Sequence, residues 1–560
     1  MSLPRNFDKL SNLEKLKILR EKGYRDVVGE RSYFFYEIYR LFKGWKVPLP
    51  DLRNIFQPEE IERLLFDSII LSNGDWIVIA KVIGFVARTG YRHEPTVDMD
   101  GKTLSLRATP LHCFNGYTPY RIIRDLLTIY SKFYVNYQED SGLTHLHVAC
   151  TASNCWDIVE KYLELGQDPN LVVEKTGDSP LHFAARGLNA FGIELLLRRG
   201  ADLNLANKDG STPLHTMVNS YNNAYYSMKV FFEINDYLGQ TVQINARDKL
   251  GNTPLHLTIT CVRRTGIMYA IELLLRRGID PTLANAAGST TLHLICQRGH
   301  DYDMYPSNRY CEDDIVERYF EMVDDQNHTL QVDARNGLGR TPLQLAVASL
   351  EPKAVDVLFD RGADLSNFVF PDESYFGEKV KARHYEFWFK FRRASSALSV
   401  VERLENRGYE LDRCDALTIM KLFAEHELFE KSEDLEERWY DDQEFVRNAR
   451  GIMIKPNLSF YDLVQLRFKV AAKQFTFTDY YNIWYAEQFW KRPHNEDCDS
   501  YLCEKLSRRF FQQCALEPFM ELIHCRLPIL CCDLIIEQLK NKDLYNICLA
   551  AADQSHDVSN

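Results

Sequence analysis

Short apolar runs separated by polar turns recur at a regular interval through the middle of the chain. The tetrad Thr-Pro-Leu-His, or a close variant of it, occurs seven times, beginning at Thr109, Thr144, Ser179, Thr212, Thr253, Thr290 and Thr341. The spacings are 35, 35, 33, 41, 37 and 51 residues, and four of the six lie near a period of ~33 residues. This period predicts stacked helical repeats, with insertions after the fourth and the sixth copy.

Each position of the tetrad suits the start of a helix. Thr or Ser can cap the helix with its hydroxyl, Pro fits the first turn because no N–H is needed there, and Leu faces the core. Six copies have a glycine two residues before the cap, where a tight turn favours positive φ. These are Gly142, Gly177, Gly210, Gly251, Gly288 and Gly339. The first copy has Arg107 instead, as terminal units often depart from a pattern.

A second motif keeps the same phase as the tetrad. Three runs rich in Leu or Val each predict a helix closed by a C-terminal glycine: 193–202, 271–280 and 355–364. With both motifs in register, the sequence resembles the ankyrin-repeat family. The resemblance implies an all-α solenoid with short β-hairpin loops and about seven repeats over residues 96–365. It also implies that the tetrad histidines form structural hydrogen bonds.

The segments before and after the repeats also have helical patterns. Residues 1–95 predict an N-terminal helical cap, with a helix start at Gln57–Glu60. The apolar window Trp76–Ala87 is too short to span a bilayer and predicts a buried helix. Residues 366–440 predict a helical connector. Ser459 and Asp462 then have the spacing of a capping box at a further helix start.

The last helices have the most specific pattern outside the repeats. Leu527-Pro528 predicts a helix start, and the apolar residues Leu530, Leu534, Ile535 and Leu539 lie largely on one face. Asp543 is placed to cap a second helix that contains Leu544. This pattern resembles an F-box core. Behind ankyrin repeats it resembles the PRANC domain of poxviral and insect ankyrin proteins, here covering residues 441–560.

That resemblance implies docking on the adaptor subunit of a cullin–RING ubiquitin ligase. The Trp439-Tyr440 region and the segment 456–463 also resemble parts of a PRANC domain. The sequence departs from the F-box pattern in two ways, because Cys531-Cys532 replaces an acidic–aliphatic pair and the third F-box helix is missing. The alternative is that residues 527–551 form a helical hairpin that covers the domain core.

Composition and charge exclude several other function classes. The net charge of −12 does not fit a general nucleic-acid binder, and the basic stretch Lys379–Arg393 fits a helix with solvated charges. The 14 cysteines form no CxxC motif, so no metal site or cofactor is expected. No phosphate loop, nucleophile elbow or HExxH is present, so an enzyme is not expected. Without a signal peptide or membrane segment, a cytoplasmic protein is expected, with the nucleus also open.

These features together predict a protein-binding adaptor. Candidate target contacts lie on hairpin tips and first helices: Arg186, Lys208, Asp209, Asn219, Lys249 and Leu250. Candidate ligase contacts lie near the C-terminus: Leu527, Pro528, Ile535, Leu539 and Leu544. The expected partners are a target protein and the ligase adaptor subunit. The alternative function is a scaffold or sequestering inhibitor of a signalling protein that needs no ligase.

Overall fold

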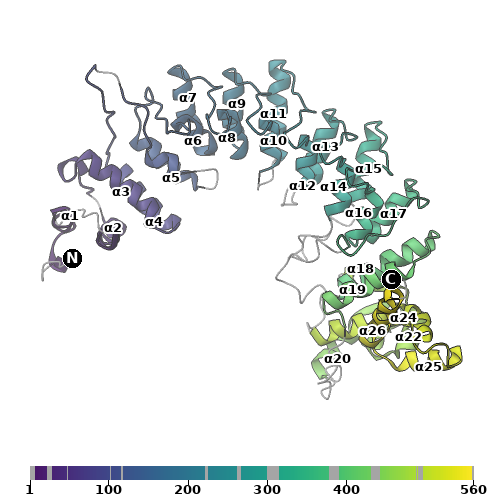
Figure 1. The fold of residues 1–560 in the computed structure, drawn as a ribbon. Coiled ribbons are helices and arrows are strands. Elements are labelled where there is room, and N and C mark those ends of the chain that lie inside the picture. Colours follow the sequence, from purple (N-terminus) through teal and green to yellow (C-terminus); the bar gives the residue numbers. More distant parts are fainter. Residues whose placement is uncertain are drawn as a thin grey trace. The chain divides into compact units, whose positions relative to one another are not determined.

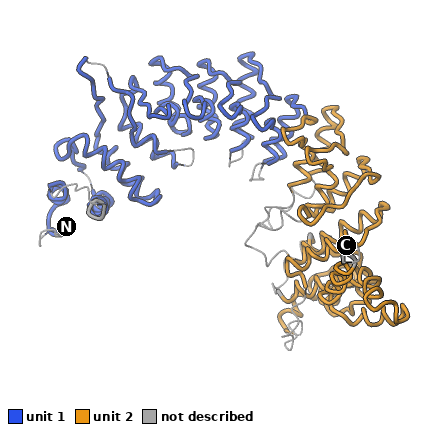
Figure 2. Tube along the Cα trace, viewed as in Figure 1, with its two compact units in different colours: residues 1–280 blue, residues 281–560 orange. Residues whose placement is uncertain are grey.

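The computed structural model is mostly α-helical and divides into two compact units, residues 1–280 and 281–560 (Figure 2). The structure describes residues 7–21, 28–46, 48–100, 103–114, 118–220, 225–260, 266–298, 315–376, 390–429, 442–486, 489 and 496–557. Within these ranges the only strands are β1 (Met453–Lys455) and β2 (Leu458–Ser459), which pair antiparallel. The predicted all-α fold class is therefore confirmed.

Unit 1 begins with a group of helices that precede the first repeat (Figure 1). They are η1 (Phe7–Lys9), α1 (Asn12–Glu21), α2 (Val28–Gly44), η2 (Leu52–Asn54), α3 (Pro58–Ile70) and α4 (Trp76–Arg88). The predicted start of α3 is confirmed, because the Gln57 N–H donates to Glu60 Oε2 at 2.7 Å. The apolar window predicted as a buried helix is α4. It packs against α5 (Tyr120–Ile129), and α3 packs against η3 (Pro110–Cys113).

Every tetrad starts a short helix, and a second helix follows it. In unit 1 the first helices are η3, α6 (His145–Thr151), α8 (Pro180–Arg186), α10 (Pro213–Val218) and α12 (Pro254–Thr260). The second helices are α5, α7 (Trp156–Glu164, preceded by η4, Ser153–Cys155), α9 (Ala190–Arg198), α11 (Tyr225–Leu238) and α13 (Ile267–Arg276). First helices pack on neighbouring first helices and second helices on second helices, so the repeats form two rows (Figure 1).

Unit 2 contains the last two tetrads and the C-terminal helices. The tetrads start the pairs α14 (Thr291–Arg298) with α15 (Ile315–Asp325), and α16 (Pro342–Ala348) with α17 (Pro352–Asp360). The C-terminal helices are α18 (Lys390–Asn406), α19 (Arg413–Glu425), α20 (Gln443–Arg450), α21 (Phe460–Gln465), α22 (Phe468–Gln474), α23 (Phe477–Tyr485), α24 (Glu496–Leu522), α25 (Ile529–Gln538) and α26 (Asn541–Asp557). The long helix α24 lies at the centre and contacts α18, α19, α22, α25 and α26.

The segment predicted as a connector contains helices that pack into this C-terminal domain. α18 contacts α17 on one side and α23 and α24 on the other, and α19 contacts α24 and α26. Most side chains along α18 are buried, including Phe391 and Leu398. Because moving such a helix would expose apolar surface, α18 cannot serve as a loose linker. We therefore propose that the C-terminal domain begins near Lys390 rather than at residue 441.

Smaller expectations for the C-terminal half have mixed outcomes. The capping box is confirmed, because the Ser459 N–H donates to Asp462 Oδ2 at 2.8 Å. The position predicted for the N-cap of the last helix, Asp543, is wrong by about one helical turn. α26 already begins at Asn541, and the Asp543 carboxylate accepts the Lys540 N–H at 3.1 Å from inside the first turn. The Trp439-Tyr440 region and residues 379–389 of the basic stretch lie outside the described residues.

Candidate protein-binding surfaces

The loops that connect successive repeats are hairpin turns with a glycine near the tip. All six predicted glycines have positive φ, between +70° and +88°. The turns close through backbone hydrogen bonds, such as that from the Asn207 N–H to the Ser211 carbonyl at 2.9 Å. A Cβ on Gly177 would lie 2.7 Å from the backbone nitrogen of Lys208 in the next loop. Glycine is therefore needed both for its backbone conformation and for the close approach of adjacent loops.

The tetrad histidines join each repeat to the next loop. His147 Nδ1 accepts the Thr144 N–H at 3.2 Å, and its Nε2 lies 2.8 Å from the Leu171 carbonyl oxygen, which can only accept. Equivalent contacts occur at His112, His182, His215 and His293. Burial lowers the pKa of all five, that of His147 to about 4. The neutral imidazole that this geometry requires is therefore the stable form.

The first repeat departs from the pattern because it faces the N-terminal helices. Arg107, which replaces the glycine, forms an ion pair with Glu62 of α3. The same carboxylate accepts a hydrogen bond from the hydroxyl of Tyr130, directly after α5, at 2.8 Å. In the second tetrad His145 replaces the proline, is fully buried, and lies with Nε2 2.7 Å from Thr109 Oγ1. These residues are specific to the contact between α3 and the first two repeats.

The candidate target contacts at the hairpin tips lie on two adjacent loops of unit 1. Lys208, Asp209, Lys249 and Leu250 are all exposed. The loops are joined by a hydrogen bond from the Lys249 N–H to the Asp209 carbonyl at 2.8 Å. Such bonds fix the backbone at these tips. The entropy lost by the tips when a partner binds is therefore small.

The two candidates on first helices have different environments. Arg186 donates to Asp178 Oδ2 at 2.8 Å, and its guanidinium lies 5.1 Å from the centroid of the Phe183 ring. Arg186 thus fastens α8 to its hairpin loop, and part of its side chain stays exposed. Asn219 follows α10 directly and is exposed. The structure therefore leaves Asn219 open to a partner, while Arg186 has a structural role as well.

The candidate ligase contacts lie around α25, whose outer side is apolar and exposed. Leu530 is 74% exposed and Leu534 is 63% exposed. Leu527, Pro528 and Ile535 are exposed beside them. An apolar stripe of this kind on a helix of a folded domain is typical of a surface that another protein covers.

Two other candidate ligase contacts have different positions. Leu544 is fully buried where α26 packs in the domain core, so its predicted contact with a ligase subunit is wrong. Leu539 is half-buried. Leu544 shares its inward face with Cys548 and Ala551, which are also buried. Helical periodicity marks an apolar face, but it does not say whether that face packs inside the domain or meets a partner.

The position of α25 is fixed from within the domain. Cys532 and Ile536, on its inner side, are fully buried. At the start of α26, the buried Asn541 donates from its N–H to Glu504 Oε1 at 2.9 Å and from Nδ2 to Ser507 Oγ at 2.7 Å. The outer apolar stripe is therefore carried by a helix that is already held in place.

A buried lysine joins α24 to α21. Lys505 Nζ donates to the carbonyl oxygens of Leu463, Val464 and Leu466 at 2.9, 2.6 and 2.7 Å. The last carbonyls of a helix have no partner within that helix, so this ammonium group caps α21. Burial lowers the pKa of Lys505 to about 7, whereas the three carbonyl oxygens favour its charged form. No motif in the sequence indicated this contact.

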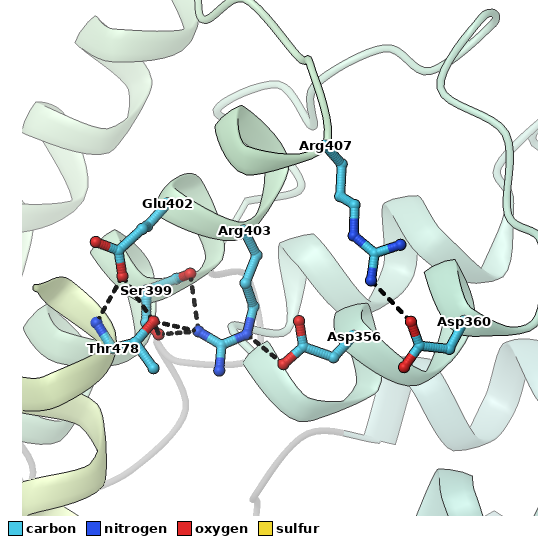
Figure 3. Close-up of polar contacts among 7 residues, drawn as sticks. All are labelled: Asp356, Asp360, Ser399, Glu402, Arg403, Arg407 and Thr478. Atoms are coloured by element: carbon cyan, nitrogen blue, oxygen red, sulfur yellow. Dashed lines mark hydrogen bonds and ion pairs between the residues drawn. The ribbon is translucent and has the colours of Figure 1, made fainter.

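A polar network fixes the C-terminal domain to the last ankyrin helix (Figure 3). Arg403, on α18, donates from Nε to Asp356 Oδ2 of α17 at 2.6 Å and from Nη1 to Thr478 Oγ1 of α23 at 2.9 Å. Glu402 accepts the Thr478 N–H at 2.8 Å and so caps the start of α23. The Arg403 side chain is only 11% exposed. One guanidinium therefore links three helices of unit 2.

α18 also ends in the same way as the second helices of the repeats. Gly408 has φ of +92°, close to the +93° of Gly362 after α17. After both helices, the N–H of the glycine donates to a carbonyl three residues earlier, and the next N–H donates to one five residues earlier. This is a Schellman-type helix end.

The arginine before this glycine repeats the ankyrin pattern too. Arg407 pairs with Asp360 of α17 at 2.7 Å (Figure 3), and Arg361 pairs in the same way with Asp324 of α15 at 2.5 Å. Each guanidinium also lies over a phenylalanine ring of the preceding helix, at 5.2 and 4.7 Å from the centroid. α18 thus stacks on α17 as α17 stacks on α15. The Arg-Gly pair at 407–408 was the sequence signal that could have identified this additional helix.

The described ranges lack two features that define other classes of protein. There, no three His, Cys, Asp or Glu side chains are grouped so that they could hold a metal ion. Among the same residues, no helix combines the length and the apolar character needed to cross a membrane.

A family model described as ankyrin repeats in three copies matches residues 111–207, 146–236 and 181–285. The chain is 27% identical over 231 residues to the human transient receptor potential cation channel subfamily A member 1, covering 40% of this chain and 18% of that protein. It is 29% identical over 154 residues to a putative ankyrin repeat protein of fowlpox virus, covering 27% of this chain and 44% of that protein. It is 26% identical over 279 residues to human ankyrin repeat and SOCS box protein 16, covering 47% of this chain and 59% of that protein.

The crystal structure of the human ASB11 ankyrin repeat domain is similar at 20% identity and a TM-score of 0.32, over 46% of this chain and 96% of that one. The chain spans about a fifth or less of the length of the first curated relatives that it matches. The repeat motifs, their hydrogen bonds and the family match together establish that the chain contains ankyrin repeats. Solenoid repeats of this kind form extended surfaces that are suited to binding other proteins.

Proposed function

We propose that this protein is a substrate receptor that brings a target protein to a cullin–RING ubiquitin ligase. In this proposal the ankyrin repeats hold the target, with Lys208, Asp209, Lys249 and Leu250 among its contacts. The outer face of α25 docks on the adaptor subunit of the ligase. The exposed apolar stripe of Leu527, Leu530, Leu534 and Ile535 is the observation that carries the proposal.

The energetics of such a stripe favour docking. Burying a leucine side chain contributes roughly 1.5–3 kcal/mol, so two or three leucines can supply the centre of an interface. The inner side of α25 and the Asn541 contacts already hold the helix, so little ordering is needed when the partner binds. The name of one relative also joins ankyrin repeats to a SOCS box.

The direct test is titration of the full-length chain with the purified adaptor subunit of a cullin–RING ligase. The test variant is Leu530→Asp with Leu534→Asp. The matched control is Leu338→Asp, because Leu338 is a hairpin-tip leucine of the same unit with the same 74% exposure as Leu530. We expect saturable binding that the double variant weakens at least tenfold and the control leaves unchanged. Binding that survives in the double variant, with circular dichroism unchanged, would contradict the proposal.

The second candidate function is a scaffold or sequestering inhibitor that needs no ligase. Two observations favour it: Leu544 is buried rather than available, and Cys531-Cys532 replaces the usual F-box pair. If the adaptor subunit does not bind at all while the chain still blocks its target, this second function is the correct one. The same titration therefore separates the two candidates.

A further inference from the structure

Four exposed aromatic side chains lie at the start of four consecutive second helices in unit 1. Trp156 is the first residue of α7, Phe191 and Tyr226 are the second residues of α9 and α11, and Tyr269 is the third residue of α13. Their exposed fractions lie between 47% and 65%. We call these four residues the aromatic ladder. Exposed aromatic residues that recur along one edge indicate a contact surface, because such side chains dominate the energy of protein interfaces.

Contacts between the starts of these helices keep the ladder in a row. The Asn189 side chain, which caps α9, donates at 3.3 Å to the carbonyl oxygen of Ala152, which precedes η4 and α7. Ser227 of α11 donates to a carbonyl oxygen in the loop before α9 at 3.0 Å. The rings of Tyr225 and Tyr269 lie 5.7 Å apart between α11 and α13. Figure 1 shows α7, α9 and α11 side by side in this order.

Charged side chains near the ladder are paired within the protein. Asp157, next to Trp156, pairs with Arg124 at 2.8 Å. The following helices each have one ion pair of the i, i+4 type, at 3.0, 3.8 and 2.6 Å: Glu194–Arg198, Lys229–Glu233 and Glu272–Arg276. A partner that fits this edge therefore needs no net charge. Electrostatic complementarity favours an uncharged, apolar segment.

The spacing of the ladder selects among uncharged segments. Packed helices lie about 8–10 Å apart, so the helices that carry the ladder follow one another at about that interval. A polyproline II helix advances about 9.3 Å in each three-residue turn. We propose that the aromatic ladder binds a proline-rich segment of about ten residues in this conformation, with every third residue against one ring. Proline packs on aromatic faces, and Trp and Tyr can donate to the carbonyls that polyproline II leaves unpaired.

The test is fluorescence anisotropy of the full-length chain with a labelled ten-residue peptide of Pro-Pro-Leu repeats. A Gly-Ser-Leu repeat peptide keeps the leucine spacing without the polyproline conformation. The test variant is Phe191→Ala with Tyr226→Ala, and the control is Tyr237→Ala, which removes an exposed tyrosine of α11 outside the ladder. We expect the Pro-Pro-Leu peptide to bind, the double variant to weaken it at least tenfold, and Tyr237→Ala to change it less than twofold.

Three results would overturn the proposal: no binding of the Pro-Pro-Leu peptide, equal binding of the Gly-Ser-Leu peptide, or no effect of the double variant. Sedimentation of the chain alone tests whether a second copy of the chain occupies the ladder instead. If the wild-type chain is a dimer and the double variant is a monomer, the ladder is a dimer interface and the proposal is overturned. Circular dichroism of each variant checks that unit 1 remains folded. The assay contains no ligase subunit, so its outcome is independent of the proposed docking at α25.

Discussion

The repeats and the C-terminal helices both bury polar side chains, but they do so in different ways. In the repeats, five tetrad histidines bond to the residue three before them and to the next loop, so the same arrangement recurs along the described chain. In the C-terminal helices, Lys505 and Asn541 each have contacts that occur once. A recurring environment can be recognised from sequence because each copy supports the interpretation of the others. A unique environment offers no such comparison.

The largest predicted effect tests the close contact between adjacent repeat loops. Gly177→Ala places a methyl group 2.7 Å from the Lys208 backbone nitrogen at a residue with φ of +76°. Left-handed strain of about 1–2 kcal/mol and the clash together should destabilise this region by about 3–4 kcal/mol. Amide hydrogen exchange in α8 and α10 measures the loss locally.

Gly200→Ala is the matched control for that substitution. Gly200 has a similar φ of +87°, but a Cβ added there would have no atom within 4 Å. Only the conformational cost of about 1–2 kcal/mol should therefore remain. Equal effects of the two substitutions would show that the contact between loops is unimportant.

The next effect concerns the junction between the ankyrin helices of unit 2 and the C-terminal domain. Arg403→Met removes the link among α17, α18 and α23 and leaves Asp356 without its partner. We expect a loss of about 2–3 kcal/mol in the urea unfolding of this unit, because the guanidinium is largely buried. Arg407→Met, at the exposed pair with Asp360, should cost less than about 1 kcal/mol. A reversed order would refute the junction described here.

The sequence predicted the repeats well because their determinants are local and repeated. The tetrads, the loop glycines and the helix ends at Gly200, Gly278 and Gly362 all follow from short motifs. The pattern did not predict that α18 continues the stacking, because its first-helix tetrad is absent and only Arg407-Gly408 remains. Nor could periodicity place Leu544 inside and Leu530 outside, since that depends on which helices pack on α25 and α26.

Acid should distinguish unit 1 from unit 2. The pKa of His147 is lowered from 6.5 to about 4, so its contribution to stability is complete above pH 6.5 and is lost as the pH falls toward 4. At pH 5 this one residue accounts for about 2 kcal/mol. Unit 1 has four histidines with this geometry and a lowered pKa. In the described part of unit 2, His293 is the one tetrad histidine of this kind. Hydrogen exchange at pH 7 and pH 5 should show greater loosening in the repeats of unit 1.

The seventh repeat suggests a substitution that keeps the hydrogen bonds of the tetrad histidine but removes its titration. In the seventh tetrad Gln344 replaces histidine, accepts the Thr341 N–H at 2.9 Å and donates to the Val369 carbonyl at 2.9 Å. His147→Gln should therefore keep stability at pH 7 within about 1 kcal/mol and reduce the acid sensitivity of its repeat. If acid sensitivity is unchanged, the buried histidines are not its source.

The smallest predicted effect on stability belongs to α25. Leu530→Asp with Leu534→Asp should change the free energy of unfolding by less than about 0.5 kcal/mol, because both side chains are already in solvent. Leu544→Asp, on the buried face of α26, should instead cost several kcal/mol. Thermal unfolding of the two variants measures these losses, and so compares the exposed face of α25 with the buried face of α26. A large loss in the double variant would mean that the stripe packs within the protein.

Hydrogen exchange of the full-length chain, with and without the ligase adaptor subunit, tests the central claim most directly. The claim is that the ankyrin repeats and α25 are separate binding surfaces of one receptor. We predict new protection in residues 527–538 on addition of the adaptor subunit, with no change at the hairpin tips of residues 208–209 and 249–250. Protection at the hairpin tips alone, or no protection at α25 at saturating adaptor, would contradict the account.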